Sequence, residues 1–358
     1  MMKVKPSKAT RMMAKFVKAG RVPMVHGSPG IAKSALVRKV AQEHNLKVID
    51  VRLAQCDPTD LLGFPQISEQ HIEAVTLADG TKVADAQVVK RAEYAPMTMF
   101  PLEHDPIPDG YDGWLIFFDE FNACAKAVQA AAYKIVLERQ IGPHNLHKRV
   151  AMICAGNLET DNGIVEPMST PMQSRLVHME LIVDAPEWID WANENHFDHR
   201  ITSFIGFKPS ALFTFKPDHQ DTTFACPRTW EFANSVMKVT ADDDEDRLEM
   251  LAGTLTEGMA REFLAYCRIH ADLPKVPAIA ANPEGIQVPS ELSVLFAITD
   301  SIAHHTTKDN ISQLMKFIVR LPKEFQAVCL RGMVRRNKTL MTTTAVQDWV
   351  RTSAIELF

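Results

Sequence analysis

A glycine-rich loop that ends in lysine and serine lies near the amino terminus. It fits the pattern G-x-x-x-x-G-K-[ST] except at one position, and consists of Gly27, Ser28, Pro29, Gly30, Ile31, Ala32, Lys33 and Ser34. In this pattern, backbone N–H groups surround phosphates, the lysine reaches the β- and γ-phosphates, and the hydroxyl holds Mg²⁺. Ala32 departs from the pattern, and its Cβ would cost roughly 1–2 kcal/mol if φ were positive there. Because glycine-rich turns also precede helices for purely structural reasons, the loop alone does not decide the chemistry.

Two acidic residues follow an apolar segment farther along the chain. The segment 115–118 ends in Asp119 and Glu120. Because successive side chains of a strand diverge, Asp119 can face the Mg²⁺ of the phosphate loop while Glu120 points towards an attacking water. The alternative is a solvated strand end that carries acids by chance. It does not explain why the acids follow Lys33 and Ser34 in the order that phosphoryl-transfer chemistry requires.

Two further polar residues lie where such a site would need them. Asn157 follows the apolar segment 150–155 through Gly156, so its amide could position water or contact the γ-phosphate at the same sheet edge. Alone, a Gly-Asn pair indicates only a turn. Arg175 precedes the last apolar segment and could reach the nucleotide of a neighbouring subunit, a contribution of roughly 10³–10⁵ in rate. A surface salt bridge is the competing interpretation for Arg175.

The elements that would position these residues follow from the apolar pattern. Five near-continuous apolar segments predict strands buried on both faces, at 22–26, 48–53, 114–118, 150–155 and 177–181. They alternate with helical patterns, which predicts an α/β fold with a parallel five-stranded sheet and helices on both faces. One helical stripe is especially regular and comprises Val128, Ala131, Ala132, Ile135 and Val136.

We expect three domains. Residues 1–185 form the α/β core, in which 63–113 is an insertion with a small hairpin or helix; 186–272 form a helical lid; and 273–358 form a helical extension. The insertion is long for a connection between strands, and such insertions tend to be functional. The acidic run 242–246 is expected to be a solvated loop or helix start.

Composition narrows the class of protein. The 358 residues have a formal net charge of −5 and are 46% hydrophobic, which excludes wholesale disorder and argues against a generally basic nucleic-acid binder. The first 42 residues nevertheless contain ten basic residues and no acid. An amphipathic pattern at 7–19 could belong to a targeting peptide, but it leads directly into the first strand, and we interpret it as part of the fold.

No apolar segment approaches the ~20 residues that span a bilayer. The six cysteines include no C-x-x-C pair, which favours reduced thiols and a cytoplasmic location, or the host cytoplasm if the chain is phage-encoded.

The pairs His144/His147 and His196/His199 lack the spacing of metal sites. A basic patch near the carboxyl terminus could touch nucleic acid, although a solvated helix face is commoner; it comprises Arg331, Arg335, Arg336 and Lys338.

The motifs together resemble those of MoxR-type AAA+ ATPases, which are related to the ATPase subunits of magnesium chelatase. The resemblance covers 22 to about 232, and the strings that carry it are GSPGIAKSAL, LIFFDEFNACAKAVQAAAYKIVLERQIG, AGN, VEPMSTPMQSRLVHMEL and CPRTWE. Alanine at the last glycine position of the loop occurs in that family. The insertion is longer than in a minimal member, and the block 273–358 lies outside the match.

The resemblance implies a role for each matched residue. Lys33 and Ser34 correspond to the Walker A motif, and Asp119 and Glu120 to Walker B. Asn157 corresponds to sensor 1, Arg175 to the arginine finger and Arg228 to sensor 2. Residues 140–149 correspond to the pre-sensor-1 hairpin, and part of 63–113 to the helix-2 insert. The implied cofactors are ATP and Mg²⁺, and the implied assembly is a homo-oligomeric ring, typically a hexamer, with each site shared between subunits.

The leading hypothesis is a ring-forming ATPase that remodels a protein partner, for which a separate von Willebrand A domain protein is one candidate. The absence of an Asn-Lys-x-Asp string favours ATP over GTP. One alternative is a nucleic-acid-dependent motor or loader, which would show steep salt dependence. A second is a nucleotide-gated structural ring or switch. No membrane partner is expected.

Overall fold

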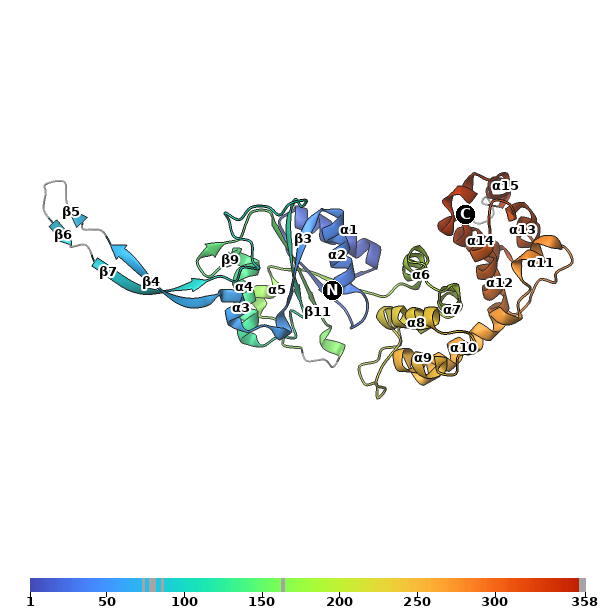
Figure 1. Ribbon diagram of the computed structural model, residues 1–358, viewed down its shortest axis with the longest axis horizontal. Coiled ribbons are helices and arrows are strands. Elements are labelled where there is room, and N and C mark those ends of the chain that lie inside the picture. The colour runs from blue at the N-terminus through green and yellow to red at the C-terminus, as the bar shows by residue number, and fades with distance from the viewer. Residues whose placement is uncertain (73–74, 77–81, 85–86, 162–164, 354–358) are drawn as a thin grey trace. The chain divides into compact units, whose positions relative to one another are not determined.

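The computed structural model describes the chain except for residues 73–74, 77–81, 85–86, 162–164 and 354–358. The chain divides into two compact units, Met1–Ile182 and Val183–Phe358. The first unit is built around a sheet, whereas every regular element described in the second is a helix (Figure 1). The predicted change from α/β to helical structure near residue 185 is therefore found.

The sheet of the first unit has six parallel strands in the order β1-β12-β2-β11-β8-β3. Their bounds are Lys3–Val4 for β1, Pro23–His26 for β2, Leu46–Arg52 for β3, Gly113–Asp119 for β8, Val150–Gly156 for β11 and Val177–Leu181 for β12. The five predicted strands are all present. The expected count of five is nevertheless wrong, because β1 adds a sixth strand beside β12. Two residues are too short to show a periodic pattern.

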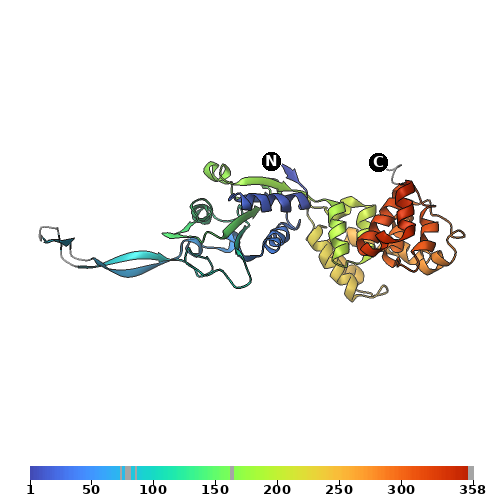
Figure 2. The same cartoon turned by 90° about the horizontal axis from the view of Figure 1, so that it is seen from above.

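Helices cover both faces of this sheet, as predicted (Figures 1 and 2). Helices α1 (Pro6–Lys18) and α2 (Lys33–Glu43) pack together on one face. The other face carries α4 (Lys126–Glu138), with α3 (Pro58–Leu62) and α5 (Thr170–Gln173) nearby. All five residues of the predicted stripe in α4 are buried. Ala9 and Met13 of α1 are fully buried, so the amphipathic segment at the amino terminus belongs to the fold.

The insertion forms a hairpin that is longer than expected. Strands β4 (Phe64–Ile72) and β7 (Gln87–Ala95) pair antiparallel along nine residues each, and the hairpin extends away from the sheet of its unit (Figures 1 and 2). A short pair, β5 (Val75–Thr76) and β6 (Lys82–Ala84), lies towards its tip. At its base, Gly63 has φ +93°, and a Cβ there would lie 2.3 Å from the carbonyl oxygen of Ala95.

A second hairpin occupies the predicted region 140–149. It consists of β9 (Gln140–Ile141) and β10 (His144–Asn145), which pair antiparallel. His147 follows β10, and its ring packs edge-on against Trp114, with centroids 5.0 Å apart. In the part of the chain that the structure describes, no group of three or more His, Cys, Asp or Glu side chains is arranged to hold a metal ion.

The second unit contains ten α-helices among its described residues. Their bounds are α6 Ala185–Glu194, α7 His199–Phe207, α8 Pro227–Val239, α9 Arg247–Leu255, α10 Glu257–Asp272, α11 Val276–Ala281, α12 Leu292–His305, α13 Ile311–Ile318, α14 Lys323–Arg336 and α15 Thr344–Ser353. One hydrophobic core lies among α6–α10 and another among α11–α15. Helix α12 contacts α7, α10 and α14, so the two cores are joined. The division into a lid and an extension stays a prediction.

Two surface expectations for this unit have different outcomes. The acidic run 242–246 lies between α8 and α9 and is exposed, as expected. The basic patch near the carboxyl terminus is partly neutralised, because Arg335 forms an ion pair with Asp190. Arg336 is mostly buried and donates hydrogen bonds to Asn193 at 2.9 Å and Asp300 at 3.5 Å. Sequence alone could not show that these cations pack against α6 and α12.

Four histidines gather where α7, α10 and α12 meet. The His199 ring stacks on His304 with centroids 4.7 Å apart, and His270 and His305 lie at 5.2 and 6.1 Å from it. The Nδ1 of His199 is 3.0 Å from Oδ2 of Asp300. The Nε2 of His270 is buried and has no hydrogen-bond partner among the described residues. This cluster therefore lies where helices of the two cores meet.

All six cysteines are free, and four of them, Cys124, Cys154, Cys226 and Cys329, are buried. None of the helices described is long and apolar enough to cross a membrane.

The histidine cluster gives a pH prediction. Burial, with a smaller contribution from His199 and against an opposing one from Asp300, lowers the pKa of His270 from 6.5 to about 4. The unfolded chain therefore binds a proton at higher pH than the folded one, and stability is lost as pH falls below 6.5. We expect His270 to contribute a loss of up to about 1.4 kcal/mol per pH unit between pH 6 and 4.5. Urea unfolding of the wild type and of His270→Gln at several pH values measures this loss. An equal dependence of the free energy of unfolding on pH in both proteins would contradict the prediction.

Candidate functional site

Three neighbouring strands bring the predicted site residues to one edge of the sheet. Strand β11 lies between β2 and β8 and is parallel to both. The phosphate loop follows β2, Asp119 is the last residue of β8, and Asn157 follows β11. The carboxyl ends of parallel strands meet at the same edge, where open α/β sheets bind ligands. Strand order thus places residues from three distant segments together.

The ammonium group of Lys33 connects the loop with Asn157. Lys33 is the first residue of α2, and its Nζ donates hydrogen bonds to the carbonyl oxygens of Gly27 and Ser28, the latter at 3.0 Å. It also donates to Oδ1 of Asn157 at 3.0 Å. Lys33 and Asn157 therefore lie together at this edge of the sheet. Their chemical roles stay predictions.

The hydroxyl and carboxylate expected to hold a metal also lie together. The Ser34 hydroxyl donates to Oδ2 of Asp119 at 2.8 Å. The other carboxylate oxygen of Asp119 accepts from the backbone N–H of Glu120 at 2.9 Å. Two hard oxygen donors from Ser34 and Asp119, next to a phosphate loop, fit the ligand preference of Mg²⁺.

Ala32 adopts the conformation that its residue type disfavours. Its backbone has φ 72° and ψ 25°, in the left-handed region, directly before α2. The Cβ therefore costs roughly 1–2 kcal/mol relative to a conformation with negative φ. Gly30, two residues earlier, also has positive φ (76°) but has no Cβ to strain. The loop thus keeps the shape of the motif despite its departure in sequence.

Glu120 does not lie on the strand, contrary to expectation. Strand β8 ends at Asp119, and Glu120 has φ 54°, in the left-handed region. The two acids diverge because the backbone turns, and not because of the alternation of a strand. The N–H of Phe121 then returns to the carbonyl of Ala155 on β11 at 2.8 Å. Glutamate is not a residue type that favours this conformation, so the sequence carried no signal of the turn.

Asn122 is a site residue that the sequence did not reveal. It is only 3% exposed, and its Nδ2 donates to the carbonyl of Asn157 at 2.8 Å. Its Oδ1 accepts from the backbone N–H of Asn157 at 3.0 Å. A Cβ on Gly156 would lie 2.3 Å from that Oδ1, so glycine is required beside the pair. Asn122 therefore fixes the backbone from which the Asn157 side chain reaches Lys33.

Asp161 is a second residue that the sequence did not reveal. It ends a short 3₁₀ helix, Glu159–Asp161, and its Oδ1 accepts from the Ser28 hydroxyl at 3.2 Å. The Oδ2 is buried without a hydrogen-bond partner in the described part of the chain. Sequence could not pair Ser28 with an acid 133 residues away. The contact ties the loop to the segment after β11.

The two predicted arginines differ from these residues in what the structure shows of them. The exposed Arg175 donates through Nη1 to the Tyr133 hydroxyl at 2.8 Å and to the Pro171 carbonyl at 3.2 Å. No hydrogen bond described here joins it to the phosphate loop. Arg228 is exposed near the start of α8, in the second unit. The roles of both arginines stay predictions.

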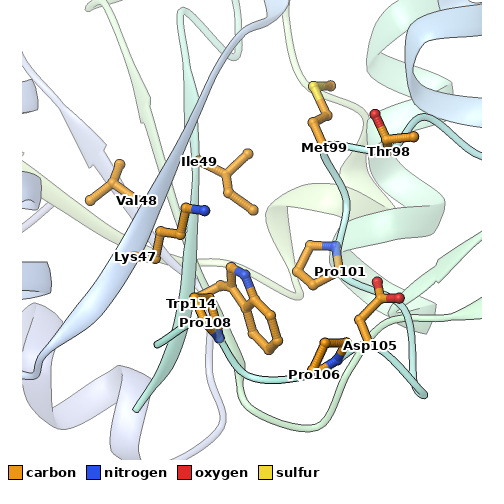
Figure 3. A pocket seen from close by; sticks show the side chains of 10 residues that line it. All are labelled: Lys47, Val48, Ile49, Thr98, Met99, Pro101, Asp105, Pro106, Pro108 and Trp114. Carbon is orange, nitrogen blue, oxygen red and sulfur yellow. The ribbon is translucent and has the colours of Figure 1, made fainter. Parts of the chain in front are cut away.

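A cavity of about 490 Å³ lies elsewhere in the first unit, beside the edge strand β3 (Figure 3). The Ile49 and Trp114 side chains point into it, and Met99 and Pro101 line the loop opposite. Neither the phosphate loop nor Asp119, Asn157 or Arg175 lines this cavity. It is therefore not the candidate site.

Ala32→Gly is expected to stabilise the first unit. Removing the Cβ of a residue in the left-handed region raises the free energy of unfolding by roughly 1–2 kcal/mol. The greater conformational freedom of glycine in the unfolded chain lowers it again by about 0.5–1 kcal/mol. Thermal unfolding would measure the difference. The matched control is Ala35→Gly, inside α2, which should destabilise by about 1 kcal/mol. A lower melting temperature for Ala32→Gly would contradict the strain assignment.

Asn122→Ala is expected to destabilise the first unit by at least about 2 kcal/mol. The change removes both hydrogen bonds to the half-buried backbone of Asn157 and empties the buried site of the Asn122 side chain, and the lost partners cost about 1–3 kcal/mol for each group. Urea unfolding followed by hydrogen exchange of the backbone amides of β8 and β11, which lie in the first unit, would measure the loss. The exposed Asn145 provides the control, since Asn145→Ala should cost about 0.5 kcal/mol or less. Equal effects of the two changes would contradict the assignment.

The comparisons agree with the site geometry. Residues 24–176 match the family AAA domain (dynein-related subfamily), a range that includes the phosphate loop, Asp119, Asn157 and Arg175. No curated protein shows significant similarity to the chain.

Two solved structures show weak overall similarity. A mutant of RuvB from Thermotoga maritima shares 13% identity with a TM-score of 0.39, over 88% of this chain and 86% of that chain. NtrX from Brucella abortus, in complex with ADP, shares 12% identity with a TM-score of 0.33, over 98% of this chain and 66% of that chain. With TM-scores below 0.5, neither similarity indicates a function or a partner.

The family match covers the same strands, loop and site residues that the geometry brings together. The unit Met1–Ile182 therefore has the α/β fold of the AAA+ ATPases.

Proposed function

We propose that this chain is a Mg²⁺-dependent ATPase of the MoxR type that acts in a ring and remodels a protein partner. The observation that supports it most is the cluster at one sheet edge. There Nζ of Lys33 donates to Oδ1 of Asn157 at 3.0 Å, and the Ser34 hydroxyl donates to Oδ2 of Asp119 at 2.8 Å. A nucleoside triphosphate needs a cation, a metal site and an amide for water or phosphate at this spacing. A surface turn with chance polar residues would not gather these four side chains from three segments.

The residues of this chain would divide the work as follows. The loop amides and Lys33 would hold the β- and γ-phosphates, while Ser34 and Asp119 would hold the metal. When bound there, Mg²⁺ supplies charge neutralisation of the phosphate oxygens. Glu120 would accept the proton of the attacking water, and Asn157 would orient that water.

The exposed position of Arg175 fits an arginine that acts on the site of another subunit. It lies on the surface of its own unit and hydrogen-bonds Tyr133, without a bond to its own phosphate loop among the described residues. We infer a homo-oligomeric ring, with six subunits expected from the MoxR resemblance. Arg228 would act as sensor 2, and the partner would be a separate protein, for which a von Willebrand A domain is one candidate.

A second function has one observation in its favour. The exposed face of α1 carries Lys8, Arg11, Lys15 and Lys18 at helical spacing, and no ion pair involves them within the described chain. Such a stripe could bind the phosphates of a nucleic acid. The net charge of −5 and the absence of an aromatic stacking surface on this face make a motor on nucleic acid the weaker candidate.

Glu120→Gln is expected to bind ATP normally and to hydrolyse it at least about 10²-fold more slowly, because the proton acceptor is lost while the loop is unchanged. Phosphate release and fluorescent-nucleotide binding would measure the two effects. The exposed Glu43, at the end of α2, gives the control variant Glu43→Gln with unchanged turnover. Unchanged turnover in Glu120→Gln would refute the site; full biological competence of that variant would favour a nucleotide-gated switch.

We expect duplex DNA and RNA to leave ATP turnover of the wild type unchanged within about twofold. The motor alternative instead predicts stimulation that falls steeply with salt and is lost in Lys8→Glu/Lys15→Glu. Turnover with and without nucleic acid, at two salt concentrations, distinguishes them.

A further inference from the structure

A pair of stacked histidines lies between the phosphate loop and the segment that carries Arg175. His26 ends β2, immediately before Gly27, and is 7% exposed. Its Nε2 lies 2.9 Å from Nδ1 of His178 on the adjacent strand β12. The two rings stack with centroids 5.2 Å apart and planes inclined by 27°. The mechanism proposed above uses neither ring.

The second nitrogen of His178 continues the connection. Its Nε2 lies 2.9 Å from the carbonyl oxygen of Gln173, the last residue of α5. A carbonyl only accepts, so this nitrogen must carry a hydrogen. When His178 is neutral, its Nδ1 is therefore an acceptor, and His26 donates to it.

His26 remains neutral near pH 7. Burial, His178, Lys33 and the chain amino terminus together lower the pKa of His26 to about 4. A neutral His26 keeps the ring hydrogen that it donates to His178, so the geometry of the pair and the protonation of His26 agree.

Each end of the connection is held by further bonds. On the loop side, the residue after His26 is Gly27, whose carbonyl accepts from Lys33 and whose N–H donates to Gly156 at 3.2 Å. On the other side, α5 supplies the Pro171 carbonyl that accepts from the Arg175 guanidinium at 3.2 Å. A displacement of the loop would therefore be transmitted through two rings to the one-turn helix that positions Arg175.

We propose that the His26–His178 pair is a positioning element that couples occupancy of the phosphate loop to the placement of Arg175. The inference rests on the proposed function in one respect: Arg175 acts on a neighbouring subunit, so the pair would link two successive sites of a ring. Phosphate binding at Lys33 must replace at least one of its bonds to Gly27, Ser28 and Asn157, and two of these three acceptors are loop carbonyls whose loss would let the loop move. The coupling itself needs only nucleotide binding.

The first test is amide hydrogen exchange of the segment 170–176 with and without a non-hydrolysable ATP analogue. In the wild type, the analogue should change exchange in this segment. His178→Phe keeps the stacked ring but loses both hydrogen bonds, and it should lose this change while its nucleotide affinity stays within about threefold. His178→Gln, whose amide can donate to Gln173 and accept from His26, should restore it. Persistence of the change in His178→Phe overturns the proposal.

The second test is a double-mutant cycle on ATP turnover. In the wild-type background, His178→Phe should lower kcat by about 3–10-fold. In a chain that already carries Arg175→Ala, adding His178→Phe should not lower kcat further. An equal loss in both backgrounds overturns the proposal, because His178 would then act elsewhere. The exposed His104 provides the control, since His104→Phe should leave kcat unchanged.

The two tests separate this proposal from the proposed function. If the wild type binds no nucleotide, the proposed function fails at that measurement. If Arg175→Ala has full turnover but the exchange result holds, the coupling is real and the arginine assignment is wrong.

Discussion

The parallel pairing of β11 with β2 on one side and β8 on the other is the constraint on which the candidate site depends. It places the ends of three strands next to one another, although they lie apart along the chain, at His26, Asp119 and Gly156. Each end then contributes one kind of group: backbone amides and a cation after β2, a carboxylate on β8, and an amide after β11. No single segment could provide this combination.

The backbone around these strand ends is irregular, and side chains satisfy its polar groups. Beyond β8 the chain turns through Glu120 in a left-handed conformation, and beyond β11 it is clamped by Asn122. A buried backbone that leaves the sheet must find new hydrogen-bond partners, or pay the full cost of desolvation. Asn122 supplies one donor and one acceptor to the same residue. Its burial is therefore explained by the geometry of the turn and not by packing.

The sequence predicted the parts of this molecule that depend on local pattern. The five main strands, the phosphate loop and the buried stripe of α4 are each encoded within about a dozen neighbouring residues. It could not predict contacts that depend on strand order, such as Asn122 with Asn157 or His26 with His178, because nothing in either segment specifies its neighbour.

Short elements, and elements with an ambiguous pattern, also could not be predicted from the sequence. Strand β1 contains too few residues to show a period, and the length of the β4–β7 hairpin depends on pairing between segments that are individually ambiguous. The sequence left the conformation of Ala32 open, because alanine disfavours a positive φ while the loop motif requires one. Tertiary context resolved the conflict in favour of the loop.

The hydrogen bonds of Lys33 have a thermodynamic consequence. An ammonium group has three donors, and here they meet the carbonyls of Gly27 and Ser28 and the amide oxygen of Asn157. A phosphate oxygen can reach this cation only by exchange for one of these partners. The free energy of binding is then the difference between two sets of charge-assisted bonds, which is smaller than either set. Under the proposed function, such an exchange would moderate the affinity for nucleotide, and the nearby acceptors of the protein would lower the free energy needed to release it.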